Sequence, residues 1–170
     1  MLVMANYING KLSPSLSGEV IEVLNPYNQE VIGTVPKSTR SDVEEALKSS
    51  QKAQKKWCKL PAQKRASYLV EIADLLELHK EEMAVLLTKE HGKPLTQARD
   101  EIDASCGFIR YAAESARRIE GEIVTSEIDQ EQTWIQRVPY GVTVGNCSLE
   151  FSISISGKEI WKILWCVEIL

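Results

Sequence analysis

Hydrophobic and polar positions alternate in the first third of the chain, and the alternation breaks at turn-forming residues. Tyr7-Ile8 runs into Asn9-Gly10, a dipeptide typical of two-residue hairpin turns. Val20–Leu24 and Val31–Val35 are rich in β-branched residues, and a proline follows closely after each segment. The pattern predicts short strands that form an antiparallel meander before residue 36.

From Ser41 onward the apolar residues recur every three or four positions, which is typical of amphipathic helices. Ser41 and Glu44 have the spacing of a capping box, which predicts a helix from there to about Lys55. Further helical segments are predicted after Pro61, with a break near His79 and an end at Gly92. Their apolar positions are Leu69, Ile72, Ala73, Leu76, Met83, Leu86 and Leu87.

A stripe of small apolar side chains marks the next helix, which is expected to open at Pro94 and to end at Gly121. Its members are Ala98, Ile102, Cys106, Ile109, Ala113, Ala116 and Ile119. Such a stripe permits close packing against a neighbouring helix. Strand-like segments return at 122–125, 133–138 and 142–144. This order of strands, helices and strands indicates an α/β or α+β fold.

Composition and charge narrow the class of protein. The chain has 170 residues, of which 44% are hydrophobic and 26% charged, as in ordinary globular domains. Its formal net charge of −4 gives no reason to expect nucleic acid or an anionic membrane as a partner. One stretch is locally basic, and we interpret it as a solvated helix face, with a polyanion site as the alternative. Its residues are Lys48, Lys52, Lys55, Lys56, Lys59, Lys64 and Arg65.

Cysteine and histidine are few and widely spaced. The cysteines are Cys58, Cys106, Cys147 and Cys166, and the histidines are His79 and His91. The spacing predicts no metal site, and it favours free thiols in a cytoplasmic protein. The first six residues resemble neither a signal peptide nor a membrane anchor, so no membrane association is expected.

No short motif carries chemistry by itself: the sequence lacks Gly-x-Gly-x-x-Gly, P-loop, His-Glu-x-x-His and Gly-x-Ser-x-Gly patterns. Cys106 lies on the apolar stripe and is expected to be a core thiol rather than a nucleophile. His91 is expected to lie at the end of a helix, near its negative pole. Glu101 and Asp103 would face different sides of their helix, so they do not form a catalytic pair.

Several segments in combination are more specific than any single motif. Tyr7–Lys11 is followed by Asn25-Pro26 and then by Glu30–Pro36. Glu90-His91-Gly92-Lys93-Pro94 comes next, and Arg137–Val142 follows in the same register. Together they resemble the amino-terminal part of the aldehyde dehydrogenase superfamily. The likeness covers Tyr7 to Gly145 and is nearest in character to succinate-semialdehyde and lactaldehyde dehydrogenases.

The resemblance implies an α/β fold in which residues 1–145 form the amino-terminal segment of a cofactor-binding domain, with a meander and helices. It implies an oligomerisation hairpin near Ile123–Val138, through which the chain would associate with itself or with a full-length paralogue. It also implies an oxidoreductase that acts on aldehydes with NAD or NADP.

Residues 146–170 form a divergent, degenerate tail. The family has a Trp-Asn-Phe-Pro motif there, whose asparagine amide helps to hold the oxyanion. This chain has Leu149-Glu150-Phe151-Ser152 instead. Glu150 would place a carboxylate at the oxyanion position, where it would repel the developing negative charge. Apolar residues alternate with Glu150 and serines over 149–156, which predicts a strand.

The sequence therefore predicts an incomplete family member in which no catalytic, cofactor-binding or metal-binding residue can be assigned. The family's cofactor-binding lysine, glycine-rich turn, general-base glutamate and nucleophilic cysteine have no counterpart before Leu170. We expect this chain alone to be inactive and not to bind the cofactor. The alternative is a non-catalytic interaction fragment that associates with a full-length paralogue. The aldehyde, and the choice between NAD and NADP, stay open at this stage.

Overall fold

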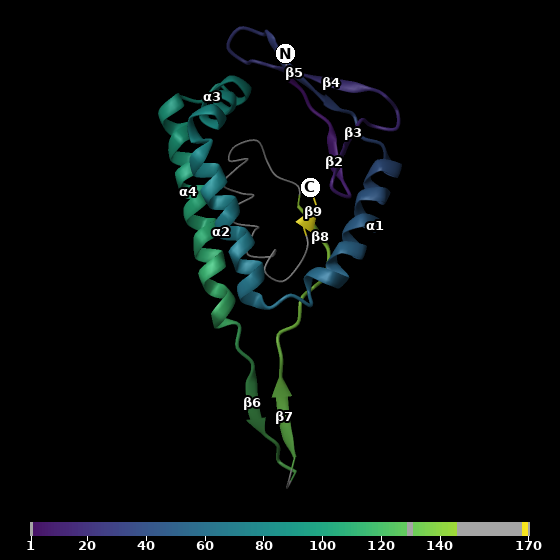
Figure 1. The fold of residues 1–170 in the computed structure, drawn as a ribbon, viewed down its shortest axis with the longest axis vertical. Helices are drawn as coiled ribbons and strands as arrows, with labels where there is room; N and C mark the ends of the chain where they lie inside the picture. Colours follow the sequence, from purple (N-terminus) through teal and green to yellow (C-terminus); the bar gives the residue numbers. More distant parts are fainter. Residues whose placement is uncertain (1, 129–130, 146–167, 170) are drawn as a thin grey trace.

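The structure is a computed structural model that describes residues 2–128, 131–145 and 168–169. A small β region and one helix lie on one side, three packed helices lie on the other, and a two-stranded hairpin extends beyond them (Figure 1). The first strands are β1 (Leu2–Val3), β2 (Asn6–Ile8), β3 (Lys11–Ser13), β4 (Val20–Leu24) and β5 (Val31–Pro36). This mixture of helix and sheet confirms the predicted α/β class.

The first third is not one continuous meander. β2 and β3 form a hairpin of their own, closed by Asn9 and Gly10 with φ of 54° and 75°, as the Asn-Gly pair predicts. β5 is the central strand of a separate three-stranded sheet. It pairs antiparallel with β4 on one edge and parallel with β1 on the other. β3 does not continue into β4 because the segment between them is tied to the helix that follows. There, the Ser15 hydroxyl shares its one hydrogen between Lys37 O, 2.7 Å from its Oγ, and Asp42 Oδ2, 3.1 Å from its Oγ.

Helix α1 (Arg40–Trp57) begins earlier than predicted. Its N-cap is Thr39, whose hydroxyl accepts from the Asp42 N–H, while the Asp42 carboxylate accepts from the Thr39 N–H over 2.6 Å. The predicted box at Ser41 and Glu44 is therefore wrong, because an overlapping Thr-x-x-Asp box lies two residues earlier and is the one formed. The apolar side of α1 is also not core, since Val43 is 50% exposed.

Three further helices follow close to the predicted boundaries, except that the last one ends before the predicted Gly121. They are α2 (Ala62–Leu78), α3 (Lys80–His91) and α4 (Leu95–Ser115), and the short 3₁₀ helix η1 (Ala116–Arg118) extends α4. The break falls at His79, and Gly92 ends α3 in the left-handed conformation with φ of 72°. Pro94 is the N-cap of α4, where the ring needs no N–H partner.

The hydrophobic core lies where α4 packs against α2, and α3 covers the upper part of α4 (Figure 1). The small-residue stripe of α4 is buried as predicted, except that Ile119 is only half-buried. Ala73 on α2 and Ala98 on α4 are both fully buried, and side chains of this size let helices approach closely. Leu69, Ile102 and Ile109 fill the remaining volume.

The outer faces of α2 and α3 keep apolar side chains at the surface. Ile72 and Leu86, two of the apolar positions in the helical pattern, are exposed because α4 covers only one face of each helix. The large apolar side chains exposed on α2, α3 and α4 are Tyr68, Val70, Ile72, Leu75, Leu78, Val85, Leu86 and Tyr111. A surface of this kind is typical of a segment that packs against further protein.

Candidate functional site

A projecting hairpin is the most distinct surface feature of the structure. It consists of β6 (Glu122–Thr125) and β7 (Gln132–Ile135), which pair antiparallel and extend away from the helices (Figure 1). Ile123 lies directly opposite Trp134, and all eight strand residues are exposed. The hairpin expected near Ile123–Val138 is confirmed, with shorter strands than the sequence suggests.

The base of the hairpin is fixed by a close backbone contact. A Cβ on Gly121 would lie 2.5 Å from the carbonyl oxygen of Ile135, so only glycine allows the two strands to approach here. η1 leads from α4 into this glycine and carries Arg117 and Arg118 at the surface. The hairpin is thus anchored to the core helix rather than to a loose loop.

Many apolar side chains of the hairpin stay exposed to solvent, because two short paired strands cannot bury them. Its exposed apolar side chains, with the exposed fraction of each residue, are Ile123 (62%), Val124 (44%), Ile128 (62%), Trp134 (63%), Ile135 (47%) and Val138 (72%). Apolar patches far from the core mark protein–protein contact sites. The arrangement is therefore suited to association rather than to binding a small molecule.

A buried ion pair organises the Glu90–Pro94 segment. The Lys93 ammonium contacts Glu101 Oε2, and the two side chains are only 15% and 3% exposed. Ser105 closes the next turn of α4 by donating to the Glu101 carbonyl over 2.7 Å. Asp103 faces elsewhere and pairs with Lys80, so Glu101 and Asp103 do not form a catalytic pair, as predicted. His91 is the last residue of α3, also as predicted.

Cys106 is a core thiol. The residue is 2% exposed, and its Sγ lies 3.7 Å from the carbonyl oxygen of Ala73. Burial raises the pKa of the Cys106 thiol, and the nearby Glu77 carboxylate raises it further. A thiol that resists ionisation is a poor nucleophile. The prediction that Cys106 is a core thiol is confirmed. Cys58, at the end of α1, is exposed.

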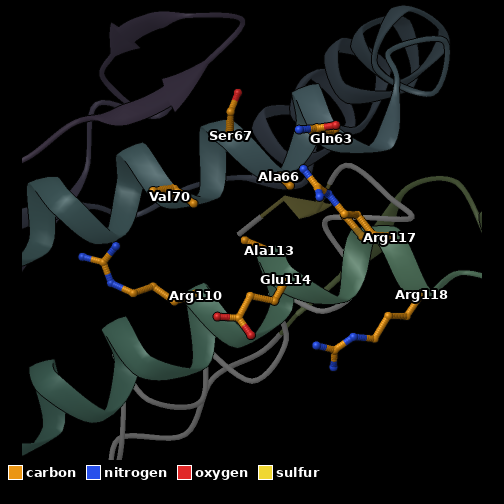
Figure 2. Close-up of a pocket in the computed structure, with 10 residues that line it drawn as sticks. Gln63, Ala66, Ser67, Val70, Arg110, Ala113, Glu114, Arg117 and Arg118 are labelled. Carbon is orange, nitrogen blue, oxygen red and sulfur yellow. The ribbon is translucent and has the colours of Figure 1, made fainter.

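A hollow of about 600 Å³ lies between α2 and the end of α4 (Figure 2). Alanines and Val70 form its floor, and three arginines surround it. Arg110 is held by Asp74 and Glu77 at 2.9 and 2.7 Å, which raises the pKa of its guanidinium. Glu114 lies on the same rim and would repel a phosphate. Glu114 and the two ion pairs of Arg110 both weaken the attraction that this hollow could exert on a phosphate.

Helix α1 gives a second test for a nicotinamide dinucleotide, because its N-terminus follows a strand that has a parallel neighbour. The Asp42 carboxylate already occupies that N-terminus and is bonded to Thr39 and to the Leu16 N–H. A phosphate there would meet a buried negative charge instead of free N–H groups. The N-terminus of α1 therefore offers no free N–H groups of the kind that hold a dinucleotide phosphate. The described residues also contain no group of three or more side chains that could hold a metal ion.

Glu150, Cys147, Cys166 and the strand predicted over 149–156 lie outside the described residues. Of the tail, only the backbone of β9 (Glu168–Ile169) is described, and it pairs in parallel with β8 (Thr143–Val144). Among the described helices, none combines the length and the apolar character needed to cross a membrane.

Comparison with known proteins identifies the class. The Aldehyde dehydrogenase family matches residues 13–166 of this chain. The chain is 34% identical to 3,6-anhydro-alpha-L-galactose dehydrogenase of Vibrio sp. (strain EJY3), over 93% of its own length and 33% of the relative's. It is 31% identical to the mitochondrial succinate-semialdehyde dehydrogenase of Oryza sativa subsp. japonica, over 94% of its own length and 30% of the relative's. The chain therefore belongs to the aldehyde dehydrogenase family.

Solved structures agree with this assignment. The structure of 3,6-anhydro-L-galactose dehydrogenase in complex with NAP superposes with a TM-score of 0.94 at 33% identity. Lactaldehyde dehydrogenase from Escherichia coli also gives a TM-score of 0.94, at 28% identity. Each alignment covers 98% of this chain and 35% of the other. The chain thus spans about a third of the length of the relatives it matches, and the resemblance to their amino-terminal part is confirmed.

Proposed function

We propose that these 170 residues form the amino-terminal assembly segment of an oxidoreductase that acts on aldehydes with NAD or NADP, and that alone they do not oxidise aldehydes. The observation that carries this proposal is the β6–β7 hairpin, which presents Ile123 and Trp134 to solvent far from the core. Residues 1–145 supply the helical core and the hairpin, and residues 146–170 depart from the family pattern at Glu150.

The chemistry of the described thiols supports the inactivity of the isolated chain. The family's reaction begins when a thiolate attacks the aldehyde. The Cys106 thiol is buried, its pKa is raised, and it faces Ala73 rather than an open surface. A carboxylate at position 150 would oppose the oxyanion formed in that attack. NAD or NADP supplies the hydride acceptor in the whole enzyme, at a site that these residues do not form alone.

The activity test measures NADH and NADPH formation by the purified chain with succinate semialdehyde and with lactaldehyde. No turnover is expected, and Glu150→Asn alone should not create any. The matched controls are Cys58→Ser and Cys106→Ser. Turnover that persists through repeated purification and disappears in Cys58→Ser would show that a thiol of this chain is the nucleophile, and the proposal would be wrong.

Association with a full-length paralogue is the second candidate, and the exposed apolar face of α2 and α3 favours it. Leu75 and Leu78 are 57% and 76% exposed, and burial of such side chains stabilises a complex. Co-expression of the tagged chain with a full-length family member from the same source, followed by purification on the tag, tests this candidate. Recovery of stoichiometric paralogue would support it, and recovery of the tagged chain alone would contradict it.

A further inference from the structure

Helix α1 concentrates positive charge in a chain that is acidic as a whole. Seven basic residues and no acidic one occur between positions 46 and 70, although the formal net charge of the chain is −4. Within α1, Lys52 has Lys48 four positions before it, and it has Lys55 and Lys56 three and four positions after it. Like charges at these spacings repel each other and destabilise a helix. A local conflict of this kind is typical of a functional surface.

The helix dipole accounts for only part of this pattern. Lys55 and Lys56 lie in the last turn of α1, where the negative pole of the helix stabilises cations. Lys48 and Lys52 lie before that turn, and the effect falls off within it. Their positive charge therefore needs another explanation.

No ion pair neutralises Lys48, Lys52 or Lys55 within residues 2–128, 131–145 and 168–169. The ion pairs that occur there involve other cations. Glu44 lies four positions before Lys48, a spacing that suits a helical ion pair, but its carboxylate is paired with Arg40 over 2.9 Å. The charge of the three lysines is thus available to a ligand.

A hollow of about 470 Å³ lies beside this part of α1, where the segment between β7 and β8 passes the helix (Figure 1). Gly141 and Val142 line one side of the hollow. The side formed by α1 consists of long polar side chains, namely Lys48, Gln51, Lys52, Gln54 and Lys55. We call Lys48, Lys52 and Lys55, all of which are exposed, the lysine face.

The lining of the hollow suits an anion. Four of its residues on α1, at positions 48, 51, 52 and 55, follow the spacing that usually places apolar side chains on the covered face of a helix. Here the same spacing carries ammonium and amide groups, which donate hydrogen bonds. No carboxylate lines the hollow, so nothing in this lining opposes a negative charge.

The length of the lysine face favours several linked phosphates over one. Lys48 and Lys55 are seven positions apart, which is about 10 Å along a helix. A single phosphate would have to draw the three ammonium groups together against their mutual repulsion. Linked phosphates instead place a separate negative charge opposite each lysine.

We propose that the lysine face and the hollow beside it bind a short chain of linked phosphates, either an inorganic polyphosphate or the triphosphate of a nucleotide. Lysine ammonium groups bind phosphate as point charges, and the Gln51 and Gln54 amides add hydrogen-bond donors. Tyr140, next to Gly141 in the chain, is 95% exposed and offers a ring on which a nucleotide base can stack.

Charge favours a short polyanion over a nucleic acid as the ligand. Because the net charge of the chain is −4, most of its surface repels a long polyanion that extends beyond the lysine face. A short phosphate chain avoids this repulsion, since it contacts only the basic part of α1. Binding of RNA through the same lysines is the competing outcome of the test.

The test is isothermal titration calorimetry of the 170-residue chain with sodium tripolyphosphate at low salt. The variant that combines Lys52→Gln with Lys55→Gln should bind at least about tenfold more weakly than the wild type, because it loses two charge-assisted contacts. Added sodium chloride should weaken binding by the wild type more than binding by this variant.

The control combines Lys11→Gln with Lys89→Gln. It gives the same change of net charge at exposed positions on β3 and α3, outside the lining of the hollow, and should bind as the wild type does. Far-UV circular dichroism checks that each variant has the helix content of the wild type.

Titration with ATP distinguishes the two sources of linked phosphates. If the ligand is a nucleotide, ATP binds more tightly than tripolyphosphate, and Tyr140→Ser should remove this gain without changing the affinity for tripolyphosphate. If the ligand is an inorganic polyphosphate, ATP binds no more tightly than tripolyphosphate, and Tyr140→Ser changes neither affinity.

Three results would overturn the inference. The first is a wild-type chain that binds no tripolyphosphate at about 1 mM and low salt. The second is equal affinity of the wild type and the Lys52→Gln, Lys55→Gln variant for tripolyphosphate, which would place the anion elsewhere. The third is a short uridine oligonucleotide that binds through these lysines when tripolyphosphate does not, which would make the lysine face an RNA site instead.

Discussion

Lys93 and Glu101 form a buried ion pair that links the turn after α3 to the first half of α4. The Glu101 side chain is only 3% exposed, so its charge depends on the lysine for compensation. The pair therefore holds the Gly92–Pro94 turn against the core helix.

Lys93→Met should lower the free energy of unfolding by about 3–5 kcal/mol, because it removes the cation facing a buried carboxylate. The double variant Lys93→Met with Glu101→Gln should lose less than Lys93→Met alone, since no charge is then buried. Urea unfolding followed by circular dichroism measures both. The control is Lys37→Met in the exposed pair with Glu19, where each side chain is 61% exposed and a loss below about 1 kcal/mol is expected. A double variant less stable than Lys93→Met would contradict this account.

Asp42 should make the stability depend on acid pH. The hydrogen bond from the Thr39 N–H holds the pKa of Asp42 below its ordinary value of 3.8. Burial opposes this shift, whereas hydrogen bonds from the Thr39 hydroxyl, the Leu16 N–H and the Ser15 hydroxyl lower the pKa further. A carboxyl whose pKa is lowered in the folded state stabilises the fold above its unfolded pKa, and this contribution disappears as the pH falls through the folded pKa.

Asp42→Asn should therefore be less stable than the wild type at pH 7, and the difference should shrink below about pH 4. Urea unfolding of both proteins from pH 7 to pH 3 measures this difference, and the other carboxyl groups contribute equally to the two curves. Glu45→Gln, an exposed substitution on the same helix, serves as the control. A difference that stays constant with pH would show that folding does not lower the pKa of Asp42, and it would contradict this account.

The two described thiols should differ sharply in reactivity. Iodoacetamide at pH 8 should label the exposed Cys58 in the folded protein and label Cys106 only after unfolding, because burial raises the pKa of the Cys106 thiol and blocks access. Peptide mass spectrometry assigns the label to each cysteine, and Cys58→Ala is the control. Equal labelling of both residues in the native state would mean that the α2–α4 core opens readily.

The sequence predicts most accurately those structural features that depend on residues adjacent in the chain, such as the ends of helices. The break at His79, the left-handed Gly92 and the N-cap at Pro94 follow from local backbone chemistry, and the structure confirms all three. The predicted start of the first helix differs from the observed one because two capping boxes overlap. The capping box formed by Thr39 and Asp42 is favoured only by the contacts that Asp42 makes with Ser15 and Leu16, which are distant from it in the sequence.

Long-range pairing explains the remaining differences. The parallel contact of β1 with β5 joins residues about thirty positions apart, and no local pattern signals it. Glu101 lies among charged residues on α4, as a surface glutamate would, and its burial follows only from the position of Lys93. The site around Glu150 was identified by resemblance alone and stays a prediction. The boundary near residue 145 likewise stays a prediction.

The hairpin gives the most direct test of the central claim that this chain is an assembly segment. Ile123 and Trp134 face each other across β6 and β7, and burial of each contributes about 1.5–3 kcal/mol to association. The measurement is sedimentation velocity of Ile123→Ser with Trp134→Ser over a concentration series. The control is Tyr27→Ser with Leu12→Ser, a pair that is at least as exposed and lies outside both the hairpin and the apolar face of α2 and α3. The account predicts that the hairpin variant associates at least about a hundredfold more weakly than the wild type, while the control is unchanged. Identical association of wild type and hairpin variant would contradict it.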